Sequence, residues 1–133
     1  MGCVLALAAA TPIRNIADYP HVERWSIKQY QTATATGPTA TLFTADWCGP
    51  CKEISPTFSE LSIRYPQVRF GEVDYSKEPR QKEEIDAIGV SRIPEIRIAT
   101  GANVDRSVGI NDTHAEDYQD LSRRIERMLQ NPQ

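Results

Sequence analysis

Two cysteines separated by two residues, Cys48 and Cys51, constrain the fold of this chain more than any other feature. They follow residues 39–45, a run of β-branched and apolar residues typical of a buried strand. Large apolar residues then recur at intervals of four, three and four over residues 54–65, which indicates an amphipathic helix. The pair is therefore predicted in the first turn of a helix that follows a buried strand, where a disulfide can join the two side chains.

The start of this helix gives the two cysteines different reactivities. Cys48 meets the unpaired N–H groups and the positive dipole end of the helix, so we expect a lowered pKa and a reactive thiolate. Cys51 lies one turn further in and should stay a thiol until a mixed disulfide forms on Cys48, which it then attacks. Between them, Gly49 permits the tight turn, and Pro50 fixes φ without an N–H that needs a partner.

A zinc site and a purely structural disulfide are two other uses of a C-x-x-C pair. The further candidate ligands for zinc are Cys3, His21 and His114, which contain no second pair with zinc spacing. We therefore predict no metal. A structural disulfide is disfavoured because closing so short a loop restricts the unfolded chain little.

The rest of the chain alternates between strand and helix periodicity. Strands are expected at residues 11–16, 39–45, 68–74, 96–98 and 104–108, and helices from residue 18, from 51, over 79–88 and from 113. The first helix would place Val22 and Trp25 on one apolar face. The order β-α-β-α-β-α-β-β-α packs most naturally as one mixed sheet with helices on both faces. We therefore predict a single α/β domain over residues 11–133.

Residues 47–52, with the sequence WCGPCK, resemble the redox site of the thioredoxin family. The similarity extends over residues 13–129 in the order of the elements, and Pro56 matches the proline that kinks the family's active-site helix. The resemblance implies the thioredoxin fold, a central mixed five-stranded sheet flanked by four helices. It also implies that Cys48 attacks the substrate disulfide and that Cys51 resolves the mixed disulfide that forms. The rule that such sites lower cysteine pKa values was itself drawn partly from thioredoxins.

The resemblance also predicts the surface that holds a substrate. Ile93 and Pro94 match the family's cis-proline and the residue before it, which lie against the dithiol, and Gly109 matches the glycine that flattens the neighbouring surface. Trp47 belongs to the same surface, and Lys52 completes the motif. A flat apolar patch of this kind suits extended, partly unfolded proteins.

Two positions depart from the family pattern. The family usually has a buried aspartate that helps to move the proton of the resolving thiol, whereas this chain has Leu42. Glu72, on the neighbouring strand, is our candidate for a substitute acid. Glu95 replaces a common threonine after the cis-proline, with Arg92 shortly before it. Both charges are expected near the substrate groove, and the alternative is a surface ion pair without effect on substrates.

The composition excludes some functions and leaves open how the N-terminal segment is used. With 15 Lys and Arg against 18 Asp and Glu, the formal net charge is −3, so no basic surface for nucleic acid is predicted. Residues 4–10 are apolar but far too few to span a bilayer, and residues 1–10 are interpreted as an apolar leader or extension. We predict a cytoplasmic monomer without stable membrane insertion. Secretion or lipid anchoring through this segment is the alternative.

Three functions fit the sequence. The first, which the resemblance favours, is reduction of protein disulfides without a bound cofactor. In this function the pair Cys48 and Cys51 receives electrons from NADPH through a thioredoxin reductase and passes them to disulfide-containing client proteins. The second is an oxidase or isomerase of an oxidising compartment. The third is a thioredoxin-like interaction module with slow chemistry, which the replacement of the buried acid by Leu42 keeps open.

Overall fold

The computed structural model describes residues 21–77, 79–101 and 103–130. The strands in this part of the chain are β1 (Val22–Arg24), β2 (Thr39–Thr44), β3 (Arg69–Asp74), β4 (Glu95–Thr100) and β5 (Asn103–Val108). The helices are α2 (Ile27–Thr36), α3 (Gly49–Arg64), α4 (Pro79–Ala87) and α5 (His114–Gln130). The strands form one sheet in the order β1-β3-β2-β4-β5. Strands β1, β3 and β2 are parallel, and β4 and β5 are antiparallel to their neighbours.

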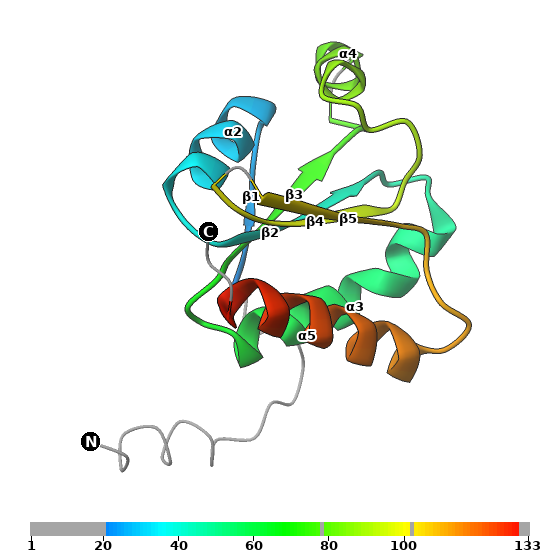
Figure 1. Cartoon of the computed structure of the whole chain (residues 1–133). Helices are drawn as coiled ribbons and strands as arrows, with labels where there is room; N and C mark the ends of the chain where they lie inside the picture. Colours follow the sequence, from blue (N-terminus) through cyan, green and yellow to red (C-terminus); the bar gives the residue numbers. More distant parts are fainter. Residues whose placement is uncertain (1–20, 78, 102, 131–133) are drawn as a thin grey trace.

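The helices cover the two faces of this sheet (Figure 1), with α3 and α5 on one face and α2 and α4 on the other. Each face has its own apolar core, because successive side chains of a strand point to opposite sides. Phe58 and Phe70 meet edge to face at 5.1 Å beneath α3, and Tyr30 and Phe43 meet at 5.2 Å beneath α2. The structure thus confirms the predicted mixed five-stranded sheet with four flanking helices.

Strand β2 is the centre of the sheet and leads directly to the cysteine motif. It pairs with β3 on one side and β4 on the other, and all six of its residues are buried. Its β-branched and apolar sequence is suited to a strand covered on both faces. The predicted strand at residues 39–45 is therefore confirmed, and it ends four residues before Cys48.

The chain before α2 differs from the sequence prediction. Residues 22–24 form β1, paired in parallel with β3, instead of continuing a helix that starts at residue 18. The helix begins only at Ile27, after the N-cap Ser26, whose hydroxyl accepts from the N–H of Gln29 while the Gln29 side chain accepts from the Ser26 N–H. Edge pairing with β3 and this capping box outweigh the weak helical spacing. The strand predicted at 11–16, and residues 1–10, lie outside the described residues.

The later helices begin within two residues of their predicted starts. Helix α3 contains Pro56 and ends at Arg64, before Pro66. Helix α4 ends at Ala87, and Gly89 follows with a φ of 88°, a left-handed conformation that favours glycine. At the start of α5, the N–H of Glu116 donates to the Thr113 hydroxyl.

Candidate active site at the Cys48–Cys51 disulfide

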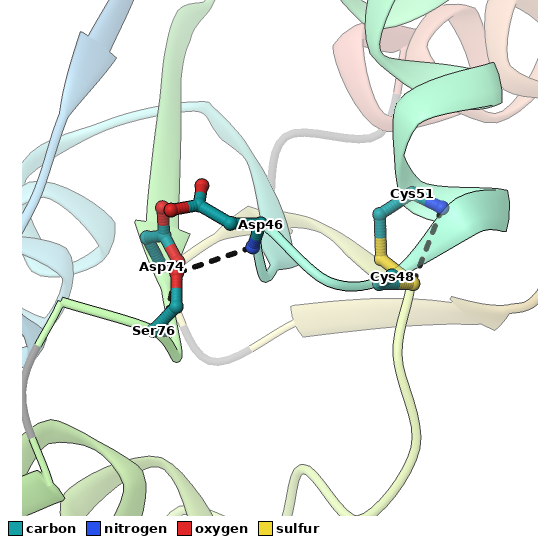
Figure 2. The surroundings of a disulfide bond; sticks show 5 residues. All are labelled: Asp46, Cys48, Cys51, Asp74 and Ser76. Carbon is teal, nitrogen blue, oxygen red and sulfur yellow. Dashed lines mark hydrogen bonds between the residues drawn. A yellow bond between two sulfur atoms is a disulfide. The ribbon is translucent and has the colours of Figure 1, made fainter.

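Cys48 and Cys51 form a disulfide at the N-terminus of α3 (Figure 2), with Cα atoms 5.3 Å apart. Cys48 is the N-cap of the helix, and its Sγ accepts a hydrogen bond of 3.2 Å from the N–H of Cys51. Cys48 is 6% exposed and Cys51 is 1% exposed. The helix therefore directs one of its free N–H groups at the more accessible sulfur, where it would stabilise a thiolate.

The loop that presents Cys48 is held from the neighbouring strand. The N–H of Asp46 donates to the Ser76 hydroxyl at 3.1 Å, and Ser76 in turn donates to the Asp74 carboxylate through its N–H and its hydroxyl. Asp46, Asp74 and Ser76 all lie to one side of the disulfide in Figure 2. The Cys48 N–H also donates to the carbonyl of Ala45 at 3.1 Å. The backbone before the first cysteine is thus fixed by both β2 and β3.

Four residues that the sequence assigned to a substrate surface can be placed in the structure. Ile93 packs against the small apolar cluster that contains both cysteines. The Ile93-Pro94 peptide is cis, as the resemblance implied, and the Pro94 carbonyl accepts a hydrogen bond of 2.8 Å from the N–H of Gly109. Trp47 is 68% exposed, which is unusual for so large an apolar side chain. The structure therefore brings Ile93 to the disulfide and joins Pro94 to Gly109.

The remaining motif residues are exposed around the disulfide. Gly49 and Pro50 form the first turn of α3, and Lys52 lies just beyond Cys51. Arg92 is exposed in the loop that precedes Ile93. None of these four contributes a buried group to the site.

The expectation that the Glu95 side chain lies at the substrate groove is wrong. Glu95 is 1% exposed, and its carboxylate binds Arg97 at 2.6 Å and Arg106 at 2.8 Å. The surface pair with Arg92 is not formed either, because the carboxylate is buried in the sheet beside these two arginines. The sequence did not reveal this because both partners follow Glu95 on β4 and β5, and only the sheet brings them together.

Glu72, the proposed substitute acid, lies on the strand next to the position of the missing aspartate. Leu42 is fully buried in the apolar core and pairs with Glu72 between β2 and β3. The Glu72 carboxylate binds Arg24 of β1 at 3.3 Å. Burial raises the pKa of Glu72, as do the charges of Asp74 and Asp46, whereas Arg24 lowers it.

Tyr75 is a residue of the site that sequence reasoning missed. Its ring packs against the same cluster as Ile93, and its hydroxyl lies 2.7 Å from an Asp86 carboxylate oxygen and 2.9 Å from the Val90 carbonyl. Burial and the neighbouring Asp86 raise the pKa of Tyr75 to about 12, so the phenol stays protonated at neutral pH. Its one sequence signal is an aromatic residue directly after a buried strand.

Metal clusters and membrane-spanning helices are both absent from the described residues. No group of three or more His, Cys, Asp or Glu side chains there could hold a metal ion. Nor is any described helix both long enough and apolar enough to cross a membrane.

The sheet topology and the disulfide at a helix N-terminus define an α/β protein of the dithiol–disulfide exchange class. The sequence model of the thioredoxin family matches residues 23–122. The chain therefore belongs to the thioredoxin family. In this family the disulfide is itself the redox group, and the chain is a thiol–disulfide oxidoreductase that reduces protein disulfides.

Individual relatives agree with this assignment. The chain is 37% identical over 84 residues to a thioredoxin of Chlamydia muridarum, a match that covers 62% of this chain and 79% of the relative. It is 35% identical over 96 residues to an H-type thioredoxin of Picea mariana, covering 71% and 74%. The crystal structure of thioredoxin from Trypanosoma brucei brucei is similar with a TM-score of 0.64 and 27% identity, covering 86% of this chain and 99% of that one.

Proposed function

We propose that Cys48 is the attacking cysteine and Cys51 the resolving cysteine of this oxidoreductase. The observation that carries the proposal is the hydrogen bond from the N–H of Cys51 to Cys48 Sγ at the start of α3. This bond and the helix dipole favour a negative charge on Cys48. Cys51 is more deeply buried, so its thiol is shielded from solvent until a partner is bound.

The proposed reaction moves two electrons and two protons from the dithiol to the substrate. The Cys48 thiolate attacks one sulfur of a client disulfide, which forms a mixed disulfide and releases one client thiolate. Cys51 then loses its proton and attacks Cys48 Sγ. This step restores the Cys48–Cys51 disulfide and releases the second client thiolate, and each released thiolate takes up a proton.

The proposed partners are disulfide-containing proteins on one side and a thioredoxin reductase on the other. The reductase would pass electrons from NADPH to the Cys48–Cys51 disulfide. Both partners would dock on the surface formed by Trp47, Ile93, Pro94 and Gly109, with Lys52, Gly49, Pro50 and Arg92 around it. The exposed Trp47 and the apolar contact of Ile93 with the disulfide support this surface. We propose that the protein acts as a monomer.

A turnover assay tests this function. Reduction of insulin disulfides is followed first with dithiothreitol and then with a thioredoxin reductase and NADPH. We expect the protein to accelerate the reaction with both electron sources. Acceleration with dithiothreitol alone would mean that the proposed reductase is the wrong donor, and no acceleration with either would contradict the reductase function.

Trapping distinguishes the roles of the two cysteines. In Cys51→Ser the mixed disulfide on Cys48 cannot be resolved, so complexes with client proteins should accumulate. In Cys48→Ser the attacking thiol is absent, and few complexes should form. The two variants are compared by nonreducing electrophoresis and mass spectrometry after incubation with oxidised clients. Equal trapping by both variants would show that the roles are wrongly assigned.

The replacement of a buried acid by Leu42 favours a second candidate function, an interaction module with slow chemistry. Leu42 has no exposed surface and lies among apolar side chains, so it cannot accept a proton from Cys51. A resolving step much slower than client release from the surface would support this alternative, and single-turnover kinetics measure that step directly.

We propose a cytoplasmic location, because a protein-disulfide reductase needs a compartment that keeps its dithiol reduced. The experiment is fractionation of the native source with mass spectrometry of the N-terminus. Intact residues 1–10 in the cytoplasmic fraction would support the proposal. Cleavage or acylation of this segment would instead favour secretion or lipid anchoring.

A further inference from the structure

Three consecutive carbonyl groups, those of residues 88–90 after α4, are each held by a side chain from the sheet. Arg97 Nη2 donates to the Ile88 carbonyl at 3.0 Å, and Arg106 Nη2 donates to the Gly89 carbonyl at 2.8 Å. The Tyr75 hydroxyl lies 2.9 Å from the Val90 carbonyl. The three side chains come from the end of β3, from β4 and from β5.

The N–H groups of the same three residues are also bound. Each donates to a carbonyl in the last two turns of α4, at distances from 3.0 to 3.3 Å. All six backbone polar groups of residues 88–90 are therefore hydrogen-bonded, so this connecting segment is held from both α4 and the sheet. We name the set Tyr75, Arg97 and Arg106 the carbonyl clamp.

Glu95 anchors the two arginines of the carbonyl clamp. Its Oε2 accepts from the Nε of both Arg97 and Arg106, and its Oε1 accepts from Arg106 at 3.1 Å. Arg97 also lies over the Phe43 ring at 5.3 Å and donates to the Tyr30 hydroxyl at 3.2 Å. The arginines are thus held in one orientation with their remaining N–H groups directed at the segment.

The segment held by the carbonyl clamp is close to the active site along the chain. Three residues, 91–93, separate residues 88–90 from Pro94, whose carbonyl accepts from the N–H of Gly109. Both ends of this short loop are therefore fixed. The loop carries the exposed Arg92 and the Ile93 side chain that packs on the disulfide cluster, and the Tyr75 ring packs on the same cluster.

We infer that Tyr75, Arg97 and Arg106 are positioning residues for substrate binding. They hold residues 88–90 so that the loop 91–93 is already ordered beside the disulfide before a client protein binds. Ordering a loop in advance removes an entropy cost from binding, so loss of the carbonyl clamp should weaken binding of extended clients. A small disulfide that reaches only the sulfur atoms should be unaffected. The inference rests on the substrate surface proposed above.

Two variants remove single members of the carbonyl clamp with little risk to the fold. Tyr75→Phe keeps the ring and loses only the hydroxyl. Arg106→Met removes a side chain that is 47% exposed, and it leaves Glu95 paired with Arg97. The matched controls are Tyr65→Phe and Arg124→Met. The Tyr65 hydroxyl, at the C-terminal end of α3, donates to Glu126 of α5, and the Arg124 side chain pairs with Asp105 and Asp120.

The first readout is steady-state reduction of insulin compared with reduction of a small aromatic disulfide. In Tyr75→Phe and Arg106→Met we expect KM for insulin to rise about fivefold, the equivalent of one lost hydrogen bond, with kcat changed less than about twofold. The rate with the small disulfide should stay within about twofold, as should all rates of the two controls. An unchanged KM for insulin in both clamp variants would overturn the inference. A parallel loss with the small disulfide would also overturn it, because it would indicate general damage to the dithiol.

Hydrogen exchange supplies a second readout that does not depend on activity. Amides of residues 88–90, which are all hydrogen-bonded in the wild type, should exchange about tenfold faster in the clamp variants and at the wild-type rate in Tyr65→Phe. Unchanged exchange would overturn the inference. The variant Trp47→Ala separates the two proposals: if it leaves KM for insulin unchanged, the proposed substrate surface is wrong. If Trp47→Ala raises KM and the clamp variants do not, the surface stands and the carbonyl clamp fails.

Discussion

Two glutamates of the central sheet, Glu95 and Glu72, have different electrostatic surroundings. Glu95 is buried beside Arg97 and Arg106, so its charge is paired and hydrogen-bonded where it would otherwise be costly. Glu72 has one close cationic partner in the described residues, Arg24, and burial raises its pKa. A carboxylate with a raised pKa is suited to proton transfer, whereas a paired one is suited to holding structure.

The variant Glu72→Gln tests whether this carboxylate receives the proton of Cys51. In the wild type we expect the resolving rate to fall as the pH drops through the raised pKa of Glu72, because a protonated carboxyl cannot accept a proton. In Glu72→Gln this limb of the profile should be absent. The measurement is the pH dependence of the resolving rate in single-turnover experiments.

Glu23→Gln is the control for this experiment, since Glu23 lies on β1, the strand that pairs with β3, but binds Arg69 instead of Arg24. Its profile should match that of the wild type. A profile for Glu72→Gln that also matches the wild type would remove Glu72 from the mechanism.

The element β1 depends on a close approach between Trp25 and β3. Trp25 follows the three residues of β1 and is buried over Gly71 of β3. A Cβ atom at Gly71 would overlap with the Trp25 ring. The absence of a side chain at this position therefore allows the indole to cover the sheet and allows α2 to begin after it.

Gly71→Ala should accordingly destabilise the fold by about 3 kcal/mol, because the ring and the strand must move apart. Gly37→Ala is the matched control, since nothing lies within 4 Å of a Cβ there and the backbone is extended. We expect the control to change stability by less than about 0.5 kcal/mol. Urea unfolding of both variants measures the difference, and equal stabilities would contradict the close packing of Trp25 on β3.

Two carboxylates contribute to the stability of the whole molecule, and their contributions change with pH in opposite directions. Arg69 lowers the pKa of Glu23 below its ordinary value of 4.5, chiefly through side-chain hydrogen bonds. The stability from this pair is present above pH 4.5 and is lost as the pH falls through the folded pKa. Burial raises the pKa of Glu72 above 4.5, so the folded state loses stability as the pH rises through that range.

Variants at these two positions should therefore change the pH profile of stability in opposite directions. Glu23→Gln should lessen the loss of stability on acidification, and Glu72→Gln should remove the gain on acidification. Each effect should stay below about 1 kcal/mol, because both side chains are partly exposed. Urea unfolding between about pH 3 and about pH 7 measures both. Parallel profiles for the wild type and both variants would contradict the assigned pKa shifts.

The sequence by itself determined the central strand, the active-site helix and the cysteine pair at their junction. These features rest on local patterns: a buried run in β2, an apolar repeat in α3 and two cysteines at fixed spacing. The order of the elements was also readable, because strands and helices alternate with different periods. Strand β1 was predicted as part of a helix, because three residues are too few to show a period and their pairing with β3 is a long-range contact.

The tertiary structure alone decided which charges meet. Glu95 follows Pro94 in the sequence and looked like a groove residue, yet β4 and β5 bring Arg97 and Arg106 to its carboxylate. In the same way Tyr75 reaches Val90 across 15 residues of sequence. Such contacts depend on strand register and on side-chain direction, which no local pattern encodes. The sequence therefore determined the redox group, and the sheet decided how its surroundings are held.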